Sequence, residues 1–184
     1  MLERNGLRYP LPEKPGNGET IEVTPGLRWL RLSLPFQLDH INLWLLREEE
    51  GWTLVDTGLF TRTTRETWER VLEEQLNGEP LVRILVTHLH PDHSGCAGWL
   101  ARRFDTEVWM SRAEYLLCRI LVADTGKPAP REGTRFYQAA GFPAEAMDHY
   151  VEHFGGFGRV VSALPESYRR LKHGDVIELG GHRW

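Results

Sequence analysis

Three histidines and one aspartate fall within six consecutive positions, in the stretch Thr87-His88-Leu89-His90-Pro91-Asp92-His93-Ser94-Gly95. With eight histidines and seven aspartates in 184 residues, the pattern H-x-H-x-D-H is expected by chance about 6 × 10⁻⁴ times. Imidazole nitrogen and carboxylate oxygen are ligands that suit zinc, and they also suit iron and manganese. Four such groups on so short a loop fit two adjacent ions better than one. The cluster therefore predicts a site for two divalent metal ions, with zinc favoured and iron or manganese as alternatives.

An apolar strand is expected immediately before this cluster, over residues 81–86 (LVRILV). Alternate residues of an extended chain point to the same side, so His88 and His90 leave the end of the strand together. The turn that follows brings Asp92 and His93 round to face them. The loop after the strand is therefore expected to present all four ligands to one region of space.

The rest of the chain alternates between strand and helix patterns. Short apolar stretches bounded by Gly and Pro predict strands, and an apolar period of 3.6 residues predicts helices. The expected strands cover residues 21–23, 27–34, 41–46, 52–55, 81–86, 107–110 and 175–179, and the expected helices cover 61–76, 94–104 and a stretch of 112–161 that is broken at 127–128 and 141–143. Because strands and helices alternate and nothing repeats at a fixed period, the fold class is predicted to be α/β.

Composition is that of a soluble globular protein, with 41% hydrophobic and 26% charged residues and a formal net charge of −4. The negative charge argues against nucleic acid as a partner, because that affinity comes from clustered Lys and Arg. No apolar run approaches the ~20 residues that span a bilayer, and the first residues lack the apolar core of a secretory signal. We therefore expect no membrane partner and a cytoplasmic location. Cys96 and Cys118 stand apart, which fits buried thiols in a reducing compartment.

The last residues read as an interrupted hairpin. A strand over 175–179 is followed by the turn signal Gly180-Gly181, and the return strand has only begun at Trp184. We therefore expect a fragment of a longer protein. Its predicted organisation is a Pro/Gly-rich segment over 1–20 and a truncated domain over 21–184, with a helical insertion at about 112–161.

The metal-ligand cluster and the earlier stretch Leu54-Val55-Asp56-Thr57-Gly58 together resemble the metallo-β-lactamase-fold metallohydrolases. This superfamily includes thioesterases such as hydroxyacylglutathione hydrolase, lactonases, nucleases and β-lactamases, and the resemblance extends over roughly residues 21–114. It implies an αβ/βα sandwich, of which this chain would be the N-terminal half with a helical insertion.

The resemblance also implies a role for each residue of the cluster. His88 and His90 would bind the first metal ion, Asp92 and His93 would bind the second, and Asp56 would steady the site from behind the ligands. Flavodiiron oxygen reductases, which resemble this superfamily, typically carry a Glu where His90 stands. The histidine at that position therefore favours hydrolysis over redox chemistry.

The function implied is a hydrolase that uses a metal-bound hydroxide on a small acyl substrate, an ester, thioester or lactone, with Asp92 also orienting the hydroxide. The aromatic residues of the segment 112–161 are expected to cover the cleft and select an apolar acyl group. One alternative is a nuclease or phosphodiesterase of the same superfamily, and another is a non-catalytic metal-binding interaction module. β-Lactamase activity is disfavoured because no export signal is recognised.

Complete members of the superfamily supply a third histidine, a bridging aspartate and a final histidine from the second half of the fold. Those residues would follow Trp184, so the 184-residue chain is expected to bind metal weakly and to be inactive on its own. It is also expected to pair with a second copy or with the missing C-terminal half, because half of a sandwich leaves one face of its sheet uncovered.

Several other residues admit a second interpretation. Asp56 fits a cap for the following helix as well as a metal-supporting role. His149 and His153 match the inverted zinc-protease pattern H-x-x-E-H, although exposed or pocket-rim positions are the favoured interpretation. His40 is expected at a strand edge, and Cys96 is expected to pack beneath a helix. Most tryptophans, namely Trp44, Trp52, Trp68, Trp99 and Trp109, are expected in the core.

Overall fold

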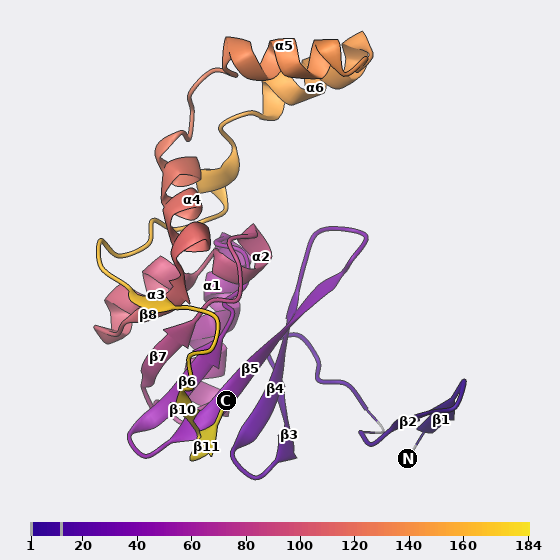
Figure 1. The fold of residues 1–184 in the computed structure, drawn as a ribbon. Helices are drawn as coiled ribbons and strands as arrows, with labels where there is room; N and C mark the ends of the chain where they lie inside the picture. The colour runs from indigo at the N-terminus through magenta and orange to yellow at the C-terminus, as the bar shows by residue number, and fades with distance from the viewer. Residues whose placement is uncertain (1, 12) are drawn as a thin grey trace.

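The computed structural model describes residues 2–11 and 13–184, and its centre is a seven-stranded sheet in the order β3-β4-β5-β6-β7-β8-β9 (Figure 1). These strands are β3 (Thr20–Thr24), β4 (Leu27–Ser33), β5 (His40–Glu48), β6 (Gly51–Val55), β7 (Leu81–Leu85), β8 (Val108–Ser111) and β9 (Arg169–Leu171). The helices are α1 (Arg62–Arg70), α2 (Pro91–Ser94), α3 (Ala97–Phe104), α4 (Arg112–Ala123), α5 (Arg131–Ala139) and α6 (Ala144–His153), with a π-helical turn η1 (Val71–Gln75) and a 3₁₀ turn η2 (Phe157–Arg159). The α/β class predicted from the sequence is confirmed.

Strand direction changes once across the sheet. Strands β3 to β6 are antiparallel neighbours, whereas β6, β7, β8 and β9 run parallel to one another. The carboxyl ends of β6, β7 and β8 therefore meet at the same edge of the sheet. The loops that carry Asp56 and the metal-ligand cluster both leave from this edge.

One face of the sheet is covered by α1, η1, α3 and the start of α4 (Figure 1). Alternate residues of each strand, such as Leu43, Leu45 and Leu54, point into this layer and are fully buried. Trp68 of α1 is also fully buried, and its indole Nε1 donates to the backbone oxygen of Thr57 at 2.8 Å. Burial of these side chains provides the main stabilisation of the domain and fixes the strand ends that hold the site.

The other face of the sheet carries apolar side chains that no helix of the described residues covers. Trp44 stacks on Trp29 of the neighbouring strand, with ring centroids 6.4 Å apart, and stays 36% exposed. The prediction that Trp44 is a core residue is therefore wrong, whereas Trp52 and Trp68 are buried as expected. A short hairpin, β10 (Glu178–Leu179) and β11 (His182–Arg183), lies beside this face. An apolar groove of about 400 Å³ lies between the hairpin and the sheet. The groove is lined by Leu27, Trp44, Leu46, Val55, Leu85, Ile177, Leu179 and Trp184.

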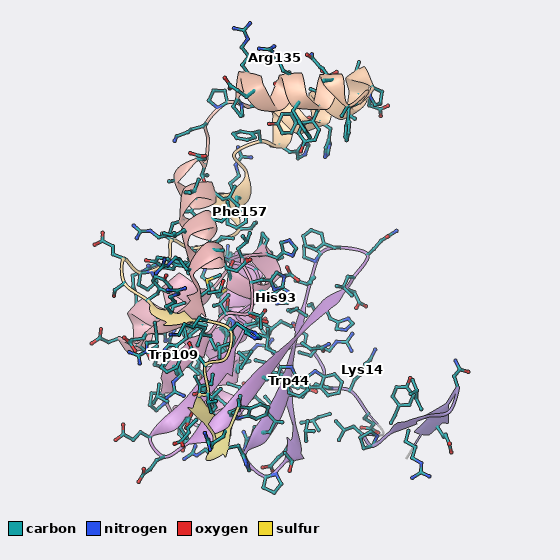
Figure 2. The ribbon with its side chains drawn as sticks, viewed as in Figure 1. Lys14, Trp44, His93, Trp109, Arg135 and Phe157 are labelled. Carbon is teal, nitrogen blue, oxygen red and sulfur yellow. The ribbon has the colours of Figure 1, made fainter. Side chains whose placement is uncertain are left out.

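The helical segment after β8 extends away from the sheet. Helices α5 and α6 form a hairpin beyond the far end of α4, and neither contains a buried residue (Figure 1). Figure 2 shows Arg135 of α5 far from His93, which lies where the helices meet the sheet. The breaks predicted at 127–128 and 141–143 fall between these helices. The expected covering of the cleft by this segment is not seen, because the α5–α6 hairpin stands well away from His93 (Figure 2).

Other differences from the sequence prediction are local. The helix expected over 94–104 begins three residues later, as α3, and a separate short helix, α2, precedes it, because the Cys96 N–H donates to Gly58 O at 3.0 Å instead of to a helical carbonyl. Residues 2–4 and 7–9 form a hairpin, β1 and β2, around Asn5 and Gly6, both of which have positive φ. Strand β9 was not predicted, and the strand expected over 175–179 is reduced to β10. In the described part of the chain, every helix is too short or too polar to cross a membrane.

Candidate metal centre

The predicted ligands lie together on residues 87–95, the metal loop, in which His88 and His90 follow β7 and Asp92 and His93 belong to the short helix α2. His90 is the N-cap of α2, and its backbone oxygen accepts from the backbone N–H groups of His93 and Ser94, both at 2.9 Å. This tight turn folds the loop back on itself, as expected for a proline at the first helical position. The ring of His88 consequently lies 4.6 Å from the ring of His90 and 4.0 Å from that of His93, measured between centroids.

The nitrogen and oxygen atoms that could donate electron pairs to a metal ion lie in two pairs, the donor pairs. His88 Nε2 is 3.0 Å from His90 Nδ1, and His93 Nε2 is 3.4 Å from Asp92 Oδ2. Two ligand atoms on one tetrahedral zinc ion are about 3.3 Å apart, given bond lengths near 2.0–2.1 Å. Both pairs therefore fit an ion each, although no group of three or more His, Cys, Asp or Glu in the described part of the chain is placed to hold one ion.

Asp56 accepts hydrogen bonds from two residues of the metal loop, Thr87 and His93. It is 5% exposed and lies in the left-handed region, with φ of 61°. Its Oδ1 accepts from Thr87 N at 2.8 Å, and its Oδ2 accepts from Thr87 Oγ1 and from His93 Nδ1, each at 2.8 Å. The following helix is capped by Thr61 instead, so the alternative role of Asp56 as a helix cap is not seen.

These hydrogen bonds determine which ring nitrogen of His93 and of His88 carries the proton and which one belongs to a donor pair. A carboxylate accepts, so His93 Nδ1 carries the proton and its Nε2 is free to bind an ion. The hydroxyl proton of Thr87 goes to Asp56, so the same oxygen accepts from His88 Nδ1 at 3.0 Å, which leaves His88 Nε2 unprotonated, as the acceptor towards His90 Nδ1 at 3.0 Å. The unprotonated Nε2 atoms of His88 and His93 each belong to one of the two donor pairs.

The charged groups around the loop shift two pKa values in opposite directions. Burial, followed by the neighbouring rings of His93 and His90, lowers the pKa of His88. Burial also acts to lower the pKa of His93, but the hydrogen bond and negative charge of Asp56, with help from Asp92, outweigh it and raise that pKa. Burial and neighbouring imidazoles therefore dominate the pKa shift of His88, whereas the two carboxylates dominate that of His93.

The residues after Asp56 hold the metal loop close to the end of β6. Thr57, directly after Asp56, donates to the backbone oxygen of His93 from both its N–H, at 2.8 Å, and its hydroxyl, at 2.7 Å. Gly95 lies against the same strand end, where a Cβ would come within 2.5 Å of Gly58 O. The loop after β6 therefore holds the metal loop so closely that there is no space for a side chain at residue 95.

Sequence reasoning missed two residues that support the loop. Glu114 Oε2 accepts from the backbone N–H of Leu89 at 2.8 Å, and the hydroxyl of the fully buried Ser94 donates to the backbone oxygen of Leu89 at 2.7 Å. Glu114 had a recognisable signal, because Ser111 and Glu114 form an S-x-x-E pattern at the start of α4. Ser111 does cap the helix, accepting from Glu114 N, but the glutamate carboxylate binds the metal loop.

The remaining candidates lie outside the loop. His40 begins β5 and its Nδ1 is 2.6 Å from Asp39 Oδ1, in agreement with a strand-edge position. Cys96 is fully buried and its thiol donates to Leu59 O, and burial raises its pKa to about 12, as expected of a packed, unreactive side chain. His149 and His153 are exposed and line a pocket between α4 and α6.

A sequence model of the metallo-beta-lactamase superfamily matches residues 37–182, which include every residue of the two donor pairs. The chain belongs to this superfamily. Its members are largely hydrolases and bind zinc. The α/β metallo-β-lactamase fold is thereby established for the chain, while the roles of the individual ligands stay predictions.

Solved structures agree with this assignment. The chain is 38% identical to a beta-lactamase domain protein from Burkholderia ambifaria, with a TM-score of 0.81, over 96% of this chain and 51% of that one. It is 27% identical to a metallo-beta-lactamase family protein from Thermus thermophilus, with a TM-score of 0.59, over 88% and 51% of the two chains. The chain thus spans about half the length of these structures. No curated protein matched the sequence.

Proposed function

We propose that the full-length protein is a hydrolase that uses two divalent metal ions, with zinc favoured, on an ester, thioester or lactone. The observation that carries this proposal is the pairing of His88 with His90 and of Asp92 with His93, at separations of 3.0 and 3.4 Å. Two adjacent ions lower the pKa of a bound water towards neutrality and polarise a carbonyl oxygen. Those are the requirements for hydrolysis of an acyl bond at neutral pH.

Each residue of the chain has a defined task in this proposal. His88 and His90 hold one ion, and Asp92 and His93 hold the other, with the Asp92 carboxylate also orienting the attacking water. Asp56 keeps the proton of His93 on Nδ1, so the ligand nitrogen stays available. A catalytic zinc normally has three protein ligands, so two per ion leave room for ligands from the remainder of the full-length protein or from a second copy.

An apolar substrate group is favoured by the side chains at the same edge of the sheet. Phe36 and Leu38, on the turn between β4 and β5, are 61% and 59% exposed. The first half of α4, whose Glu114 binds the metal loop, also exposes Leu116 and Leu117. Among the described hydrogen bonds and ion pairs, none joins a Lys or Arg to the residues of the metal loop. These features support an acyl substrate more than a phosphodiester.

The test is hydrolysis by the full-length protein of a panel of thioester, lactone, ester and phosphodiester substrates, with metal content measured in the same preparations. We expect His88→Ala and Asp92→Ala to lower turnover by several orders of magnitude and to lose metal, because the lost group holds an ion. His173→Ala, which removes an exposed histidine from a turn, is the matched control and is expected to behave as wild type. Near-normal hydrolysis and metal content in His88→Ala would refute the proposal.

A further inference from the structure

The second histidine pair, on α6, is the feature that the proposed function does not use. His149 and His153 are one helical turn apart, and their rings stack with centroids 3.9 Å apart and planes at 25°. Both are exposed and line a pocket of about 880 Å³ between the end of α4, α6 and η2. The α5–α6 hairpin stands beyond α4, well away from His93 (Figure 2). The pair is therefore separate from the candidate metal centre.

The hydrogen bond of His153 to its own helix leaves Nε2 of its ring available. Nδ1 of His153 lies 2.8 Å from the backbone oxygen of His149. A carbonyl oxygen only accepts, so Nδ1 carries the proton and Nε2 of the neutral ring has an unshared electron pair. Donation of the other ring N–H to a backbone carbonyl is the arrangement that orients histidines which bind metal ions.

The charge around the pair favours a cation. Helix α6 (AEAMDHYVEH) contains three carboxylates and no Lys or Arg. Glu145 precedes His149 by four residues and so lies on the same stripe of the helix, and it lines the same pocket. Asp124, at the end of α4, also lines this pocket, although its Oδ1 is 2.7 Å from Lys127 Nζ. A divalent ion at the two rings would lie in a negative field.

We propose that His149 and His153 form a second metal site, for a divalent ion of the copper, nickel and zinc class. Residues i and i+4 of a helix present their side chains to one point, so the exposed ring of His149 need only turn about its side-chain bonds towards Nε2 of His153, which keeps its bond to His149 O. Imidazole suits all three metals, and the Irving–Williams order places copper first. Two imidazoles and water complete the site, with Glu145 and Asp124 supplying charge. The site does not depend on the proposed hydrolase activity.

Copper(II) is the probe, because its paramagnetic resonance spectrum reports directly bound nitrogen. The full-length protein, already loaded with zinc, is titrated with Cu²⁺, and zinc release is measured in parallel. We expect one equivalent of Cu²⁺ to bind without zinc release and to show coupling to two imidazole nitrogens. His149→Ala and His153→Ala should each weaken this binding by about tenfold or more, because one of two protein ligands is lost.

Two controls make the result specific. His173→Ala removes an exposed histidine outside the pair and should leave the titration unchanged. Glu145→Gln keeps both rings and should weaken binding only slightly, through the lost charge. Circular dichroism shows whether each variant keeps its helices. Unchanged copper binding in both histidine variants, or copper uptake that is matched by zinc release, would overturn the proposal.

Discussion

Replacing Asp56 with Asn tests how the candidate metal centre is built, because the change keeps the shape of the side chain. The carboxylate accepts from Thr87 N, Thr87 Oγ1 and His93 Nδ1. The amide oxygen of Asn can still accept from Thr87 N. Its NH₂ group, however, would face the protonated Nδ1 of His93, so two donors would oppose each other. The imidazole proton is then expected to move to Nε2, the nitrogen that lies 3.4 Å from Asp92.

Two magnitudes follow from this geometry. Loss of a buried hydrogen bond to a charged group should lower the free energy of unfolding by about 1.5–3 kcal/mol. Loss of the residue that orients a ligand histidine should weaken metal binding by about 10–100-fold. The weakening should affect mainly the ion at Asp92 and His93, because Asp56 bonds directly to His93, whereas its hydrogen-bonded path to His88 runs through Thr87.

The assay, on the full-length protein, combines zinc affinity, measured by competition with a chromophoric chelator, with urea unfolding in the presence of EDTA. Asp39→Asn is the matched control, because Asp39 Oδ1 also lies 2.6 Å from a histidine Nδ1, on His40, but its side chain is 75% exposed and outside the metal loop. Asp56→Asn is expected to bind one zinc ion tightly and one weakly, whereas the control should bind both as wild type does. Retention of both ions with wild-type affinity in Asp56→Asn would refute the reasoning about the His93 proton.

Two further predictions concern buried positions. Burial raises the pKa of Cys96 to about 12 and that of Cys118 to about 11, so at pH 8 the thiolate fractions fall to about 10⁻⁴ and 10⁻³. Both thiols should therefore resist a disulfide reagent until urea is added. Rapid reaction of the native protein would contradict this. Gly98→Ala should lower the free energy of unfolding by at least about 2 kcal/mol in urea titrations, because a Cβ there would lie 1.9 Å from the backbone oxygen of Ala163; an unchanged midpoint would contradict that packing.

The sequence was sufficient to predict elements whose signals are local. The four strands from β3 to β6 were found because apolar stretches alternate with turn residues. The Gly180-Gly181 turn was found for the same reason, and both glycines have positive φ. Asn5-Gly6 is an equally strong turn signal, with positive φ at both residues, but the prolines and glycines that follow it favour an irregular segment over the β1–β2 hairpin that forms.

Elements that depend on distant partners were not predictable. Strand β9 has the sequence Arg-Arg-Leu, and it is a strand because Arg169 pairs with Trp109 of β8, sixty residues earlier, and its guanidinium lies 5.6 Å from that ring. Trp44 lies in an apolar run (INLWLL) in which both faces of the strand look suited to the core. Only the placement of the helices decides that Leu43 and Leu45 are covered and Trp44 is not.

The candidate site shows the same division between local and distant information. Ligand types and their spacing are local, so His88, His90, Asp92 and His93 could be named from the sequence. Their positions depend on residues far along the chain, because Asp56 sets the proton on His93 and Glu114 holds the backbone of Leu89. An S-x-x-E pattern predicts only that Glu114 begins a helix. That its carboxylate turns to the metal loop follows from β7 and β8 being parallel neighbours, which places the start of α4 beside the loop after β7. The candidate ligands can therefore be named from one short stretch, whereas the geometry that brings them together comes from three strand ends and one helix.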